Sequence, residues 1–303
     1  MEHLKLNVKD IMQTDVLYFD KDVERACIQI CEYLKIDNLP DIDGKSYHQY
    51  VDGKFKRLKI RSQHKISINT NLNEKALIEK FRKNRHNVLF AFQGDILKGI
   101  VHISDYNKDI VLQRTQDDIL LFERSLRQLI LLHGYKNEHM LDFYTYMFNK
   151  SRGKRKLYYN QKIHIYKERE EEITSLGPFQ VFDFSDLMLF SSSSFSNMLF
   201  KERKYTINGN LFSSYEILRN LRNLAMHGKN PISIEKENSI YSIGSLISFL
   251  DSLKVLKSEL FRLLLSIRSN KDFIRSIQLE NKSKLEIILT HHPKAIEYFL
   301  GLR

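Results

Sequence analysis

Two long segments in the second half of the chain repeat apolar residues at helical spacing, and this repetition limits the possible folds most strongly. In residues 242–268 the repeating positions are Leu246, Leu250, Leu253, Leu256, Leu260 and Leu264. In residues 116–134 they are Ile119, Phe122, Leu126, Leu129 and Ile130, and Gly134 ends the helix. Apolar stripes of this length are typical of helices that pack against other helices. The second half is therefore predicted to be an all-α bundle.

The other segments of this half support the same prediction. Residues 138–150 and 211–227 have helical patterns, and strand signals almost disappear after residue 113. The chain has only 4 Pro and 11 Gly among 303 residues, and such a scarcity of helix breakers favours helix. Residues 151–162 form a basic, polar break. Residues 163–205 have a mixed pattern, in which "FSSSSFS" is expected to be a loop.

The first 112 residues alternate between strand and helix signals. Strands are predicted at 15–19, 38–43 and 65–68, helices at 20–35 and 71–83, and a hairpin at 87–104. The helix at 20–35 is expected to bury Val23, Ala26, Ile30 and Leu34. Ser104 is expected to cap the helix that follows the hairpin. The partly repeated order predicts an α/β module of two related units. The whole chain is thus predicted to be α+β with two domains, residues 1–112 and 113–303.

The net charge favours a polyanionic partner such as nucleic acid. The chain carries a formal charge of +11. Residues 1–112 have 19 Lys and Arg against 16 Asp and Glu, a net +3, whereas residues 113–303 have 29 against 21, a net +8. The second half is therefore the better candidate for binding it. No apolar run reaches the roughly 18 residues of a membrane span, and the first residues have no signal-peptide core, so we expect a cytoplasmic protein without a membrane partner.

The two cysteines, Cys27 and Cys31, are four residues apart on a predicted helix. A lone pair of this spacing is weak evidence for metal or redox chemistry. In a reducing compartment the two side chains are expected to act as small buried apolar groups. His291 and His292 are adjacent, so their side chains diverge on a helix. No metal site is predicted.

An arginine interrupts the apolar stripe of the helix predicted at 211–227. On a helical wheel, Arg222 falls among Leu211, Tyr215, Leu218, Leu221 and Ala225. Glu123 is placed in the same way on the helix at 116–134. A buried guanidinium is costly unless it is paired, so an ion pair between Glu123 and Arg222 would explain both positions without catalysis. Arg127, four residues after Glu123, is an alternative partner within the helix.

A histidine follows Arg222 at the predicted end of the same helix. His227 precedes Gly228 and Pro231, which are typical of a helix C-terminus. The negative end of the helix dipole favours a protonated imidazole, which suits proton transfer near neutral pH. Arg222 can hold a phosphate, and Asn223, four residues before His227, can orient the imidazole or bind substrate. Together these groups suit metal-free cleavage of RNA by its own 2′-hydroxyl.

The spacing Arg222-Asn223-x-x-x-His227 resembles the Arg-polar-x-x-x-His signature of HEPN domains, which are all-α modules that include many metal-independent ribonucleases. The resemblance covers roughly residues 113–270 and implies that Arg222, Asn223 and His227 are catalytic. Arg222 and His227 lie about 140° apart on an ideal wheel, so one helix makes an incomplete site. A homodimer with a composite active site is therefore expected, as the family also implies.

The first half resembles a second family. The stretches "DIMQTDVLYFDKDVERACIQICEYLKIDNLPDID" and "RHNVLFAFQGDILKGIVHISDY" are similar to halves of two cystathionine-β-synthase (CBS) domains, which pair into a Bateman module. Members of that family often bind adenosine nucleotides through a Gly-x-x-Thr-x-x-Asp signature. Gly99, His102 and Asp105 occupy its register here, with His in place of Thr. The resemblance implies that Asp105 binds a ribose and that Ser104 helps with phosphate. A CBS pair that only dimerises or packs is the alternative.

Three basic runs remain. Residues 54–61 and 82–86 are expected to be solvated faces. The third run could contact RNA phosphates and stack a base; its residues are Arg152, Lys154, Arg155, Lys156, Tyr158 and Tyr159. Arg219, one turn before Arg222, is either a phosphate contact or a surface charge.

These observations lead to one functional hypothesis and two alternatives. The leading hypothesis is a metal-independent endoribonuclease that needs no cofactor and is gated by an adenine nucleotide in the CBS-like module. Toxin, antiviral-defence and stress roles fit it equally. The first alternative is a non-catalytic nucleotide sensor or RNA-binding scaffold in which Arg222 and Glu123 are structural. The second is a HEPN-like subunit that binds another protein through its apolar helix faces.

Overall fold

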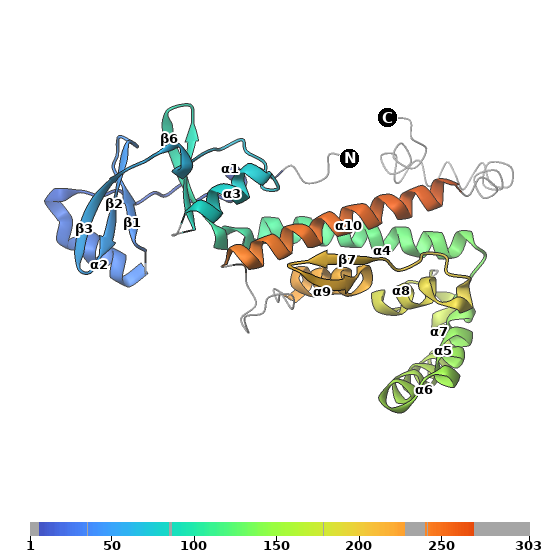
Figure 1. The fold of residues 1–303 in the computed structure, drawn as a ribbon. Helices are drawn as coiled ribbons and strands as arrows, with labels where there is room; N and C mark the ends of the chain where they lie inside the picture. Colours follow the sequence, from blue (N-terminus) through green and yellow to red (C-terminus); the bar gives the residue numbers. More distant parts are fainter. Residues whose placement is uncertain are drawn as a thin grey trace. The chain divides into compact units, whose positions relative to one another are not determined.

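The computed structural model describes residues 6–34, 36–84, 87–177, 179–227, 240 and 242–269. The chain is mixed α+β, with small sheets near the N-terminus followed by a largely helical region, as predicted at this coarse level (Figure 1). Contacts divide it into two compact units. One contains residues up to Gln116 together with Asn223–Asp251, and the other contains Asp117–Arg222 and the residues from Ser252 onward.

The first sheet of the first unit is an antiparallel meander. Its strands are β1 (Asn38–Pro40), β2 (Ser46–Val51) and β3 (Lys54–Lys59), in the order β1-β2-β3. The basic run at 54–61 therefore begins with a strand, and most of β3 is exposed, in agreement with a solvated face. The strand predicted at 15–19 is not formed.

Helix α2 (Glu24–Leu34) covers this first sheet with a different face from the predicted one. Cys27 and Cys31 are its buried residues, and they pack with Leu39 of β1. Val23 and Leu34 are exposed. The helical wheel predicted the correct period but the wrong buried face. Cysteine and alanine are only weakly apolar, so the sequence pattern did not show which face is buried. The prediction that both cysteines act as small buried apolar groups is confirmed.

The second sheet has the order β4-β5-β6. Strand β4 (Lys65–Ser67) runs parallel to β5 (Val88–Gln93), and β5 pairs antiparallel with β6 (Ile96–His102), so the predicted hairpin is confirmed. Helix α3 (Lys75–Lys83) lies between β4 and β5 in sequence and buries Leu77 and Phe81. The two sheets share a core in which Tyr47 and Ile60 meet Phe90 and Phe92. Short helices complete this part: α1 (Val8–Ile11), η1 (Lys21–Val23), η2 (Ser62–His64) and η3 (Ile103–Asn107).

The residue that caps the helical turn after the hairpin is His102, not Ser104. The Nδ1 atom of His102 accepts the backbone N–H of Ser104 at 3.1 Å, and Asp105 accepts the backbone N–H of His102 at 2.7 Å. This capping box begins η3, and α4 (Asp109–Leu132) follows directly. Since α4 is continuous from 109 to 132, the predicted boundary at 112 lies inside a helix. Gly134 adopts φ +80° just after α4, as a C-terminal glycine should.

The second unit is built mainly from helices. They include most of α4 and α10 (Ile243–Ser269), together with α5 (Glu138–Lys150), α6 (Gly153–Glu168), α7 (Glu170–Ser175), α8 (Phe184–Ser192) and the short η4 (Ser194–Ser196). In its core Phe122 of α4 meets Phe184 and Phe200 edge-on. The helices predicted at 116–134, 138–150 and 242–268 are confirmed.

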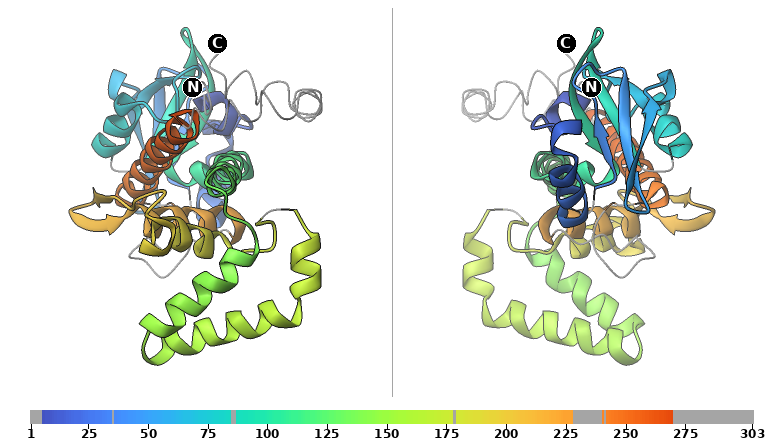
Figure 2. Two further views of the ribbon diagram at one scale, coloured as in Figure 1. Left: turned by 90° about the vertical axis from the view of Figure 1, so that its right-hand side faces the viewer. Right: turned by 90° about the vertical axis from the view of Figure 1, so that its left-hand side faces the viewer.

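Two predictions for this unit were wrong. The basic segment 151–162 is not a break, because residues 153–168 form α6; Figure 2 shows α5 and α6 meeting at an angle where α5 ends. Strands also occur, since β7 (Lys204–Ile207) and β8 (Asn210–Ser213) form an antiparallel hairpin. Helix α9 (Ser214–His227) consequently begins after Leu211, which is exposed.

Gly99 is the glycine whose missing side chain matters most for the first unit. A Cβ atom there would lie 2.6 Å from the backbone oxygen of Gln13, and the backbone of Gln13 forms a β-bridge with Ile100. We expect Gly99→Ala to push residues 12 and 13 away from β6 and to lower the free energy of unfolding by about 1–3 kcal/mol.

Gly244 provides the matched control, because a Cβ atom at this helical position meets nothing closer than 3.8 Å. Gly244→Ala should leave stability unchanged or raise it by about 0.4–1 kcal/mol. Urea unfolding followed by circular dichroism measures both changes. Equal midpoints for the two variants would contradict the proposed steric role of Gly99.

Candidate functional site

The C-terminal half of α9 carries the predicted catalytic residues. The buried face of this helix is formed by Ile217, Leu218, Leu221 and Leu224. Arg222 and Asn223 are half-buried beside that face, while Arg219 is exposed. Arg222 therefore lies at the edge of the apolar stripe, because Ile217 and Leu224 are buried and Leu211 is exposed.

His227 is the last described residue of α9. Its side chain lies outside the described part of the structure, as do Gly228 and Pro231, so the end of the helix at His227 stays a prediction. A helix that ends there would place His227 where the negative end of the helix dipole favours a positive charge. Asn223 is one helical turn earlier, on the same side of α9.

The guanidinium of Arg222 has an unused donor. Its Nε atom is buried and has no hydrogen-bond partner, and among the described residues Arg222 takes part in no ion pair. Arg262 of α10 also has an unpartnered Nε, but its guanidinium pairs with the buried Glu259 and lies over the ring of Phe200. Buried donors without partners are rare and costly, so the state of Arg222 requires an explanation.

The expected ion pair between Glu123 and Arg222 is absent from the described residues. Glu123 is buried, as its wheel position predicted, and it pairs with Arg127 at 2.5 Å on the same helix. Arg127 also donates from Nε to the backbone oxygen of Phe179 at 2.9 Å. The intrahelical alternative is therefore the one that forms. Since Arg127 neutralises Glu123, no carboxylate remains there for Arg222.

The predicted nucleotide-binding residues gather at a cavity of about 480 Å³ in the first unit. His102, Ser104 and Asp105 line it. The opposite walls contain apolar side chains, namely Val16, Leu17, Leu39, Val88 and Ile100. Gly99 does not line the cavity; its role is to let residues 12 and 13 approach β6. Three of the four predicted nucleotide-binding residues therefore line one cavity, and whether it binds a nucleotide stays a prediction.

The cavity is acidic. Among the described residues, Asp15, Asp37 and Asp105 line it, and no Lys or Arg does. One oxygen of Asp105 accepts the backbone N–H of His102, and the other lies 3.2 Å from the ammonium of Lys108. Each oxygen keeps a further lone pair for a ligand hydroxyl. Burial lowers the pKa of His102, against the opposing charges of Asp105 and Asp37, so its imidazole is neutral at pH 7.

The basic residues of α6 divide into two groups. Arg152 and Arg155 line a groove of about 550 Å³ together with Lys150. Lys154 and Lys156 are exposed and do not line it; the ammonium of Lys156 lies over the ring of Phe148. Of the basic residues predicted to contact RNA, Arg152 and Arg155 are therefore the two that line the groove.

Tyr158 is 40% exposed, but its hydroxyl is anchored to a buried residue, so its use in stacking a base stays a prediction. Its hydroxyl donates to Asp186 at 2.9 Å, and burial and the charge of Asp186 raise its pKa to about 12. Tyr159 is buried. Both tyrosines hold α6 in place, because a helix with a weak apolar stripe must be attached by other contacts.

Asp186 is a residue that sequence reasoning missed. It is fully buried on α8 and accepts hydrogen bonds from the hydroxyls of Tyr144 and Tyr158, each at 2.9 Å. Lys162 contacts it at 2.9 Å and Asp183 at 2.6 Å. Burial opposes the charge of Lys162, but these two carboxylates raise its pKa overall. An aspartate between apolar residues of "FSDLMLF" was the available signal.

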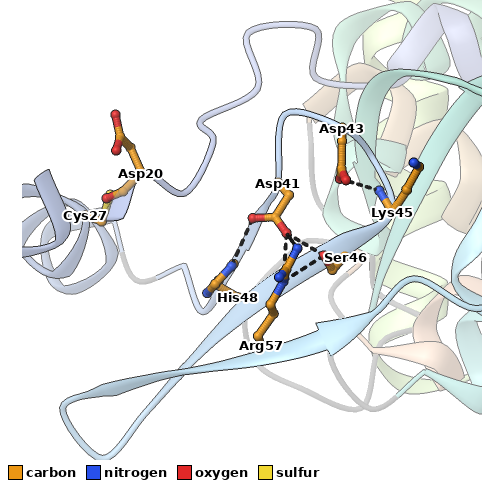
Figure 3. Close-up of polar contacts among 8 residues, drawn as sticks. All are labelled: Asp20, Cys27, Asp41, Asp43, Lys45, Ser46, His48 and Arg57. Carbon is orange, nitrogen blue, oxygen red and sulfur yellow. Dashed lines mark hydrogen bonds and ion pairs between the residues drawn. The ribbon is translucent and has the colours of Figure 1, made fainter. Parts of the chain in front are cut away.

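A second polar cluster lies in the first sheet (Figure 3). Asp41 accepts the hydroxyl of Ser46 and the Nε of Arg57, the latter at 3.1 Å, and lies 3.0 Å from Nε2 of His48. Burial raises the pKa of Asp41, but the bond from Ser46 and the charges of His48 and Arg57 lower it overall. Because Ser46 binds Asp41 and not His48, the cluster joins strands and does not form a nucleophile–base pair.

The described residues were also considered for membrane-spanning helices and for groups of metal ligands. No helix in this part of the chain combines the length and apolar character needed to cross a membrane. No group of three or more His, Cys, Asp or Glu side chains is arranged there to hold a metal ion. His291 and His292 lie outside the described residues.

The partner of Glu123 can be tested by double-mutant cycles on the free energy of unfolding. Glu123→Gln and Arg127→Gln should be coupled by about 0.5–3 kcal/mol, because the two charges meet at a largely buried position. Glu123→Gln and Arg222→Gln should be additive. Coupling in the second pair, or additivity in the first, would contradict the assignment of Arg127 as the partner.

Comparison of the chain with family models, with curated proteins and with solved structures gives no match. The resemblances to HEPN and CBS domains therefore stay predictions from short motifs and from the order of elements.

Proposed function

We propose that the chain is a metal-independent endoribonuclease whose catalytic groups lie at the C-terminal end of α9. The observation that carries this proposal is the guanidinium of Arg222, which has a buried, unpartnered Nε. It lies five residues before His227, the last described residue of α9. A phosphate is a suitable ligand for such a guanidinium, because it can accept two charge-assisted hydrogen bonds at once.

The proposed reaction requires a base, a group that stabilises negative charge, and an acid. A base takes the proton from a 2′-hydroxyl, and the resulting oxygen attacks the adjacent phosphorus. Arg222 stabilises the negative charge that builds up on the phosphorane oxygens. An acid then gives a proton to the departing 5′-oxygen. His227 suits acid–base work because it is at the dipole's negative end, and Asn223 is placed to orient it or to bind substrate.

A homodimer would supply the second acid–base group. Arg222 and His227 are about 140° apart around α9, so one copy cannot direct both along a single narrow face. Two copies of α9 that meet across a two-fold axis would bring two arginines and two histidines to one cleft. One histidine would then act as the base and the other as the acid.

A purely structural role for Arg222 is less well supported by the contacts. A structural arginine would be expected to resemble Arg127, which binds Glu123 and the oxygen of Phe179, or Arg262, which binds Glu259. Arg222 has no such partner among the described residues. If it binds a protein partner instead of RNA, the chain is a scaffold, and the cleavage test below gives a negative result.

Cleavage should be measured with labelled RNA in the presence of EDTA. His227→Ala should lower the rate by about 10²–10⁴-fold, since it removes a proton-transfer group. Arg222→Ala should lower it by about 10²–10³-fold, since it removes charge stabilisation of the phosphorane. Both variants should keep the circular dichroism spectrum and the oligomeric state of the unaltered chain.

His133→Ala is the matched control, because His133 is an exposed histidine just after the end of α4. It should cleave at the unaltered rate. Undiminished cleavage by His227→Ala would contradict the proposed mechanism. Activity that appears only when Mg²⁺ or Mn²⁺ is added would contradict metal independence.

A second function is proposed for the cavity in the first unit, namely binding of an adenosine-containing effector that gates cleavage. His102, Ser104 and Asp105 line this cavity beside apolar walls that suit a purine ring. Asp105 can accept ribose hydroxyls. Because none of the described residues that line the cavity is Lys or Arg, we expect any phosphates to extend toward solvent, and adenosine and its phosphates to differ little in affinity.

Isothermal titration with adenosine, AMP, ATP and cyclic adenylates tests this binding. Asp105→Asn should weaken it about ten- to hundredfold, the range expected for hydrogen bonds to a charged group. Asp109→Asn, at an exposed aspartate in the first turn of α4, should leave it unchanged. Failure of every ligand to bind, with cleavage unaffected, would leave this unit as a packing or dimerisation module.

A further inference from the structure

A groove of about 550 Å³ lies where α5 ends and α6 begins, within the second unit. Residues from three elements line it: the last turns of α5, the start of α6, and the serine-rich segment from α8 to η4. Those that matter here are Tyr146, Lys150, Arg152, Arg155, Ser192 and Ser194. Figure 2 shows the angle between α5 and α6 at which the first two elements meet.

The groove has an excess of uncompensated positive charge. Lys150, Arg152 and Arg155 line it, and none of the described residues that line it is Asp or Glu. Between residues 150 and 167 the chain has seven Lys and Arg and no acidic residue. Arg152 and Arg155 are exposed and form no ion pair within the described ranges. Lys162, by contrast, is neutralised by Asp183 and Asp186. Arg152 and Arg155 are therefore cations of the groove that have no acidic partner among the described residues.

Hydroxyl groups complement these charges. Ser192, Ser193 and Ser194 line one side of the groove. Lys150 donates to the hydroxyl of Tyr146, whose oxygen lies 2.5 Å from that of Ser194. The bond from Lys150, followed by that from Ser194, lowers the pKa of Tyr146. The hydroxyls of Ser192 and Ser193 donate to the backbone oxygens of Leu189 and Phe190, at 3.3 and 2.8 Å. The serines therefore give the groove a polar wall, and the cations supply the phosphate contacts.

The groove also has an apolar part. Met147 is half-buried, and Leu189 is 40% exposed although it belongs to an otherwise apolar helix. An unpaired base offers an apolar face to such a surface, whereas the bases of a duplex are stacked on one another. This apolar part favours a single strand over a duplex.

We propose that this groove binds the phosphodiester backbone of single-stranded RNA, with Arg152 and Arg155 as the main phosphate contacts. The identification of the polyanion as RNA rests on the ribonuclease proposed above. The groove lies on α5, α6 and α8, not on α9, so it is a substrate-holding surface and not a second catalytic site. A solvated face would explain exposed cations, but it does not explain their convergence with three serines and an apolar surface.

The test is binding of a fluorescent single-stranded RNA with 2′-O-methyl groups at every position, measured by anisotropy with the full chain. Such RNA cannot be cleaved through its 2′-oxygens, so the result is independent of catalysis. Replacing both arginines, Arg152→Gln with Arg155→Gln, should weaken binding about 10- to 30-fold at 0.1 M salt. It should also reduce the slope of log K against log salt by about 1.4, or about 0.7 for each lost phosphate contact.

The matched control replaces two exposed lysines of the same unit that do not line the groove, Lys136→Gln with Lys167→Gln. It removes the same charge and should change the salt slope by much less. Equal losses in the two double variants would overturn the groove and leave only a general effect of charge. A duplex that binds as tightly as the single strand, or inorganic phosphate that displaces nucleic acid at low millimolar concentration, would also overturn the proposal as stated.

Discussion

The buried carboxylate of Asp186 is the contact on which the arrangement of the second unit most depends. It is fully buried, and its oxygens accept from Tyr144 on α5 and Tyr158 on α6 and pair with Lys162 on α6. A buried charge is tolerated only with such partners, and removal of one leaves a penalty of several kcal/mol. These directional bonds therefore fix α6 against α5 and α8, although α6 has little apolar surface to hold it. The same attachment brings Arg152 and Arg155 beside the serines that follow α8.

Other buried charged groups have ion-pair partners, whereas Arg222 has none among the described residues. Glu123 has Arg127, Asp186 has two tyrosines and a lysine, and Glu259 has Arg262 and the hydroxyl of Tyr205. The Nε atoms of Arg222 and Arg262 both lack a hydrogen-bond partner among the described residues, but Arg262 has an ion pair with Glu259, whereas Arg222 has no ion pair there. Groups left unpaired in this way are frequently found where a ligand or a second chain completes the bonding. The catalytic proposal for α9 and the substrate-holding proposal for the groove rest on this common reasoning about unused donors.

The sequence was sufficient wherever a strong apolar period decided the structure. The helices α4, α5 and α10 and the β5–β6 hairpin were predicted from period and turn residues, because apolar burial dominates their stability. Helix α6 could not be predicted, since polar bonds to Asp186 hold it and its sequence resembles a loop. The β2–β3 hairpin was missed because its outer strand is basic and mostly exposed. The contacts that hold α6 are distant in sequence, whereas those of the β2–β3 hairpin are local, and its Asp52-Gly53 turn was the available signal.

The candidate sites show the same contrast between features set by local sequence and features set by contacts between distant residues. Local reasoning brought His102, Ser104 and Asp105 to one cavity. It failed for the expected Glu123–Arg222 pair, because the choice of partner depends on neighbours in space. A wheel shows that Glu123 faces the core, but not which cation reaches it. Gly99 was assigned to a ligand because of a motif, whereas its physical requirement is the close approach of Gln13.

The central claim is that RNA is cleaved by its own 2′-hydroxyl at α9. It is tested most directly by an oligonucleotide with one 2′-deoxy nucleotide on the 5′ side of the mapped cleavage position, with the ends of the products identified by mass spectrometry. The account predicts that the unaltered RNA yields a 2′,3′-cyclic phosphate and a 5′-hydroxyl, and that the single 2′-deoxy substitution abolishes cleavage at that position. Cleavage that persists there, or products with a 3′-hydroxyl and a 5′-phosphate, would contradict it.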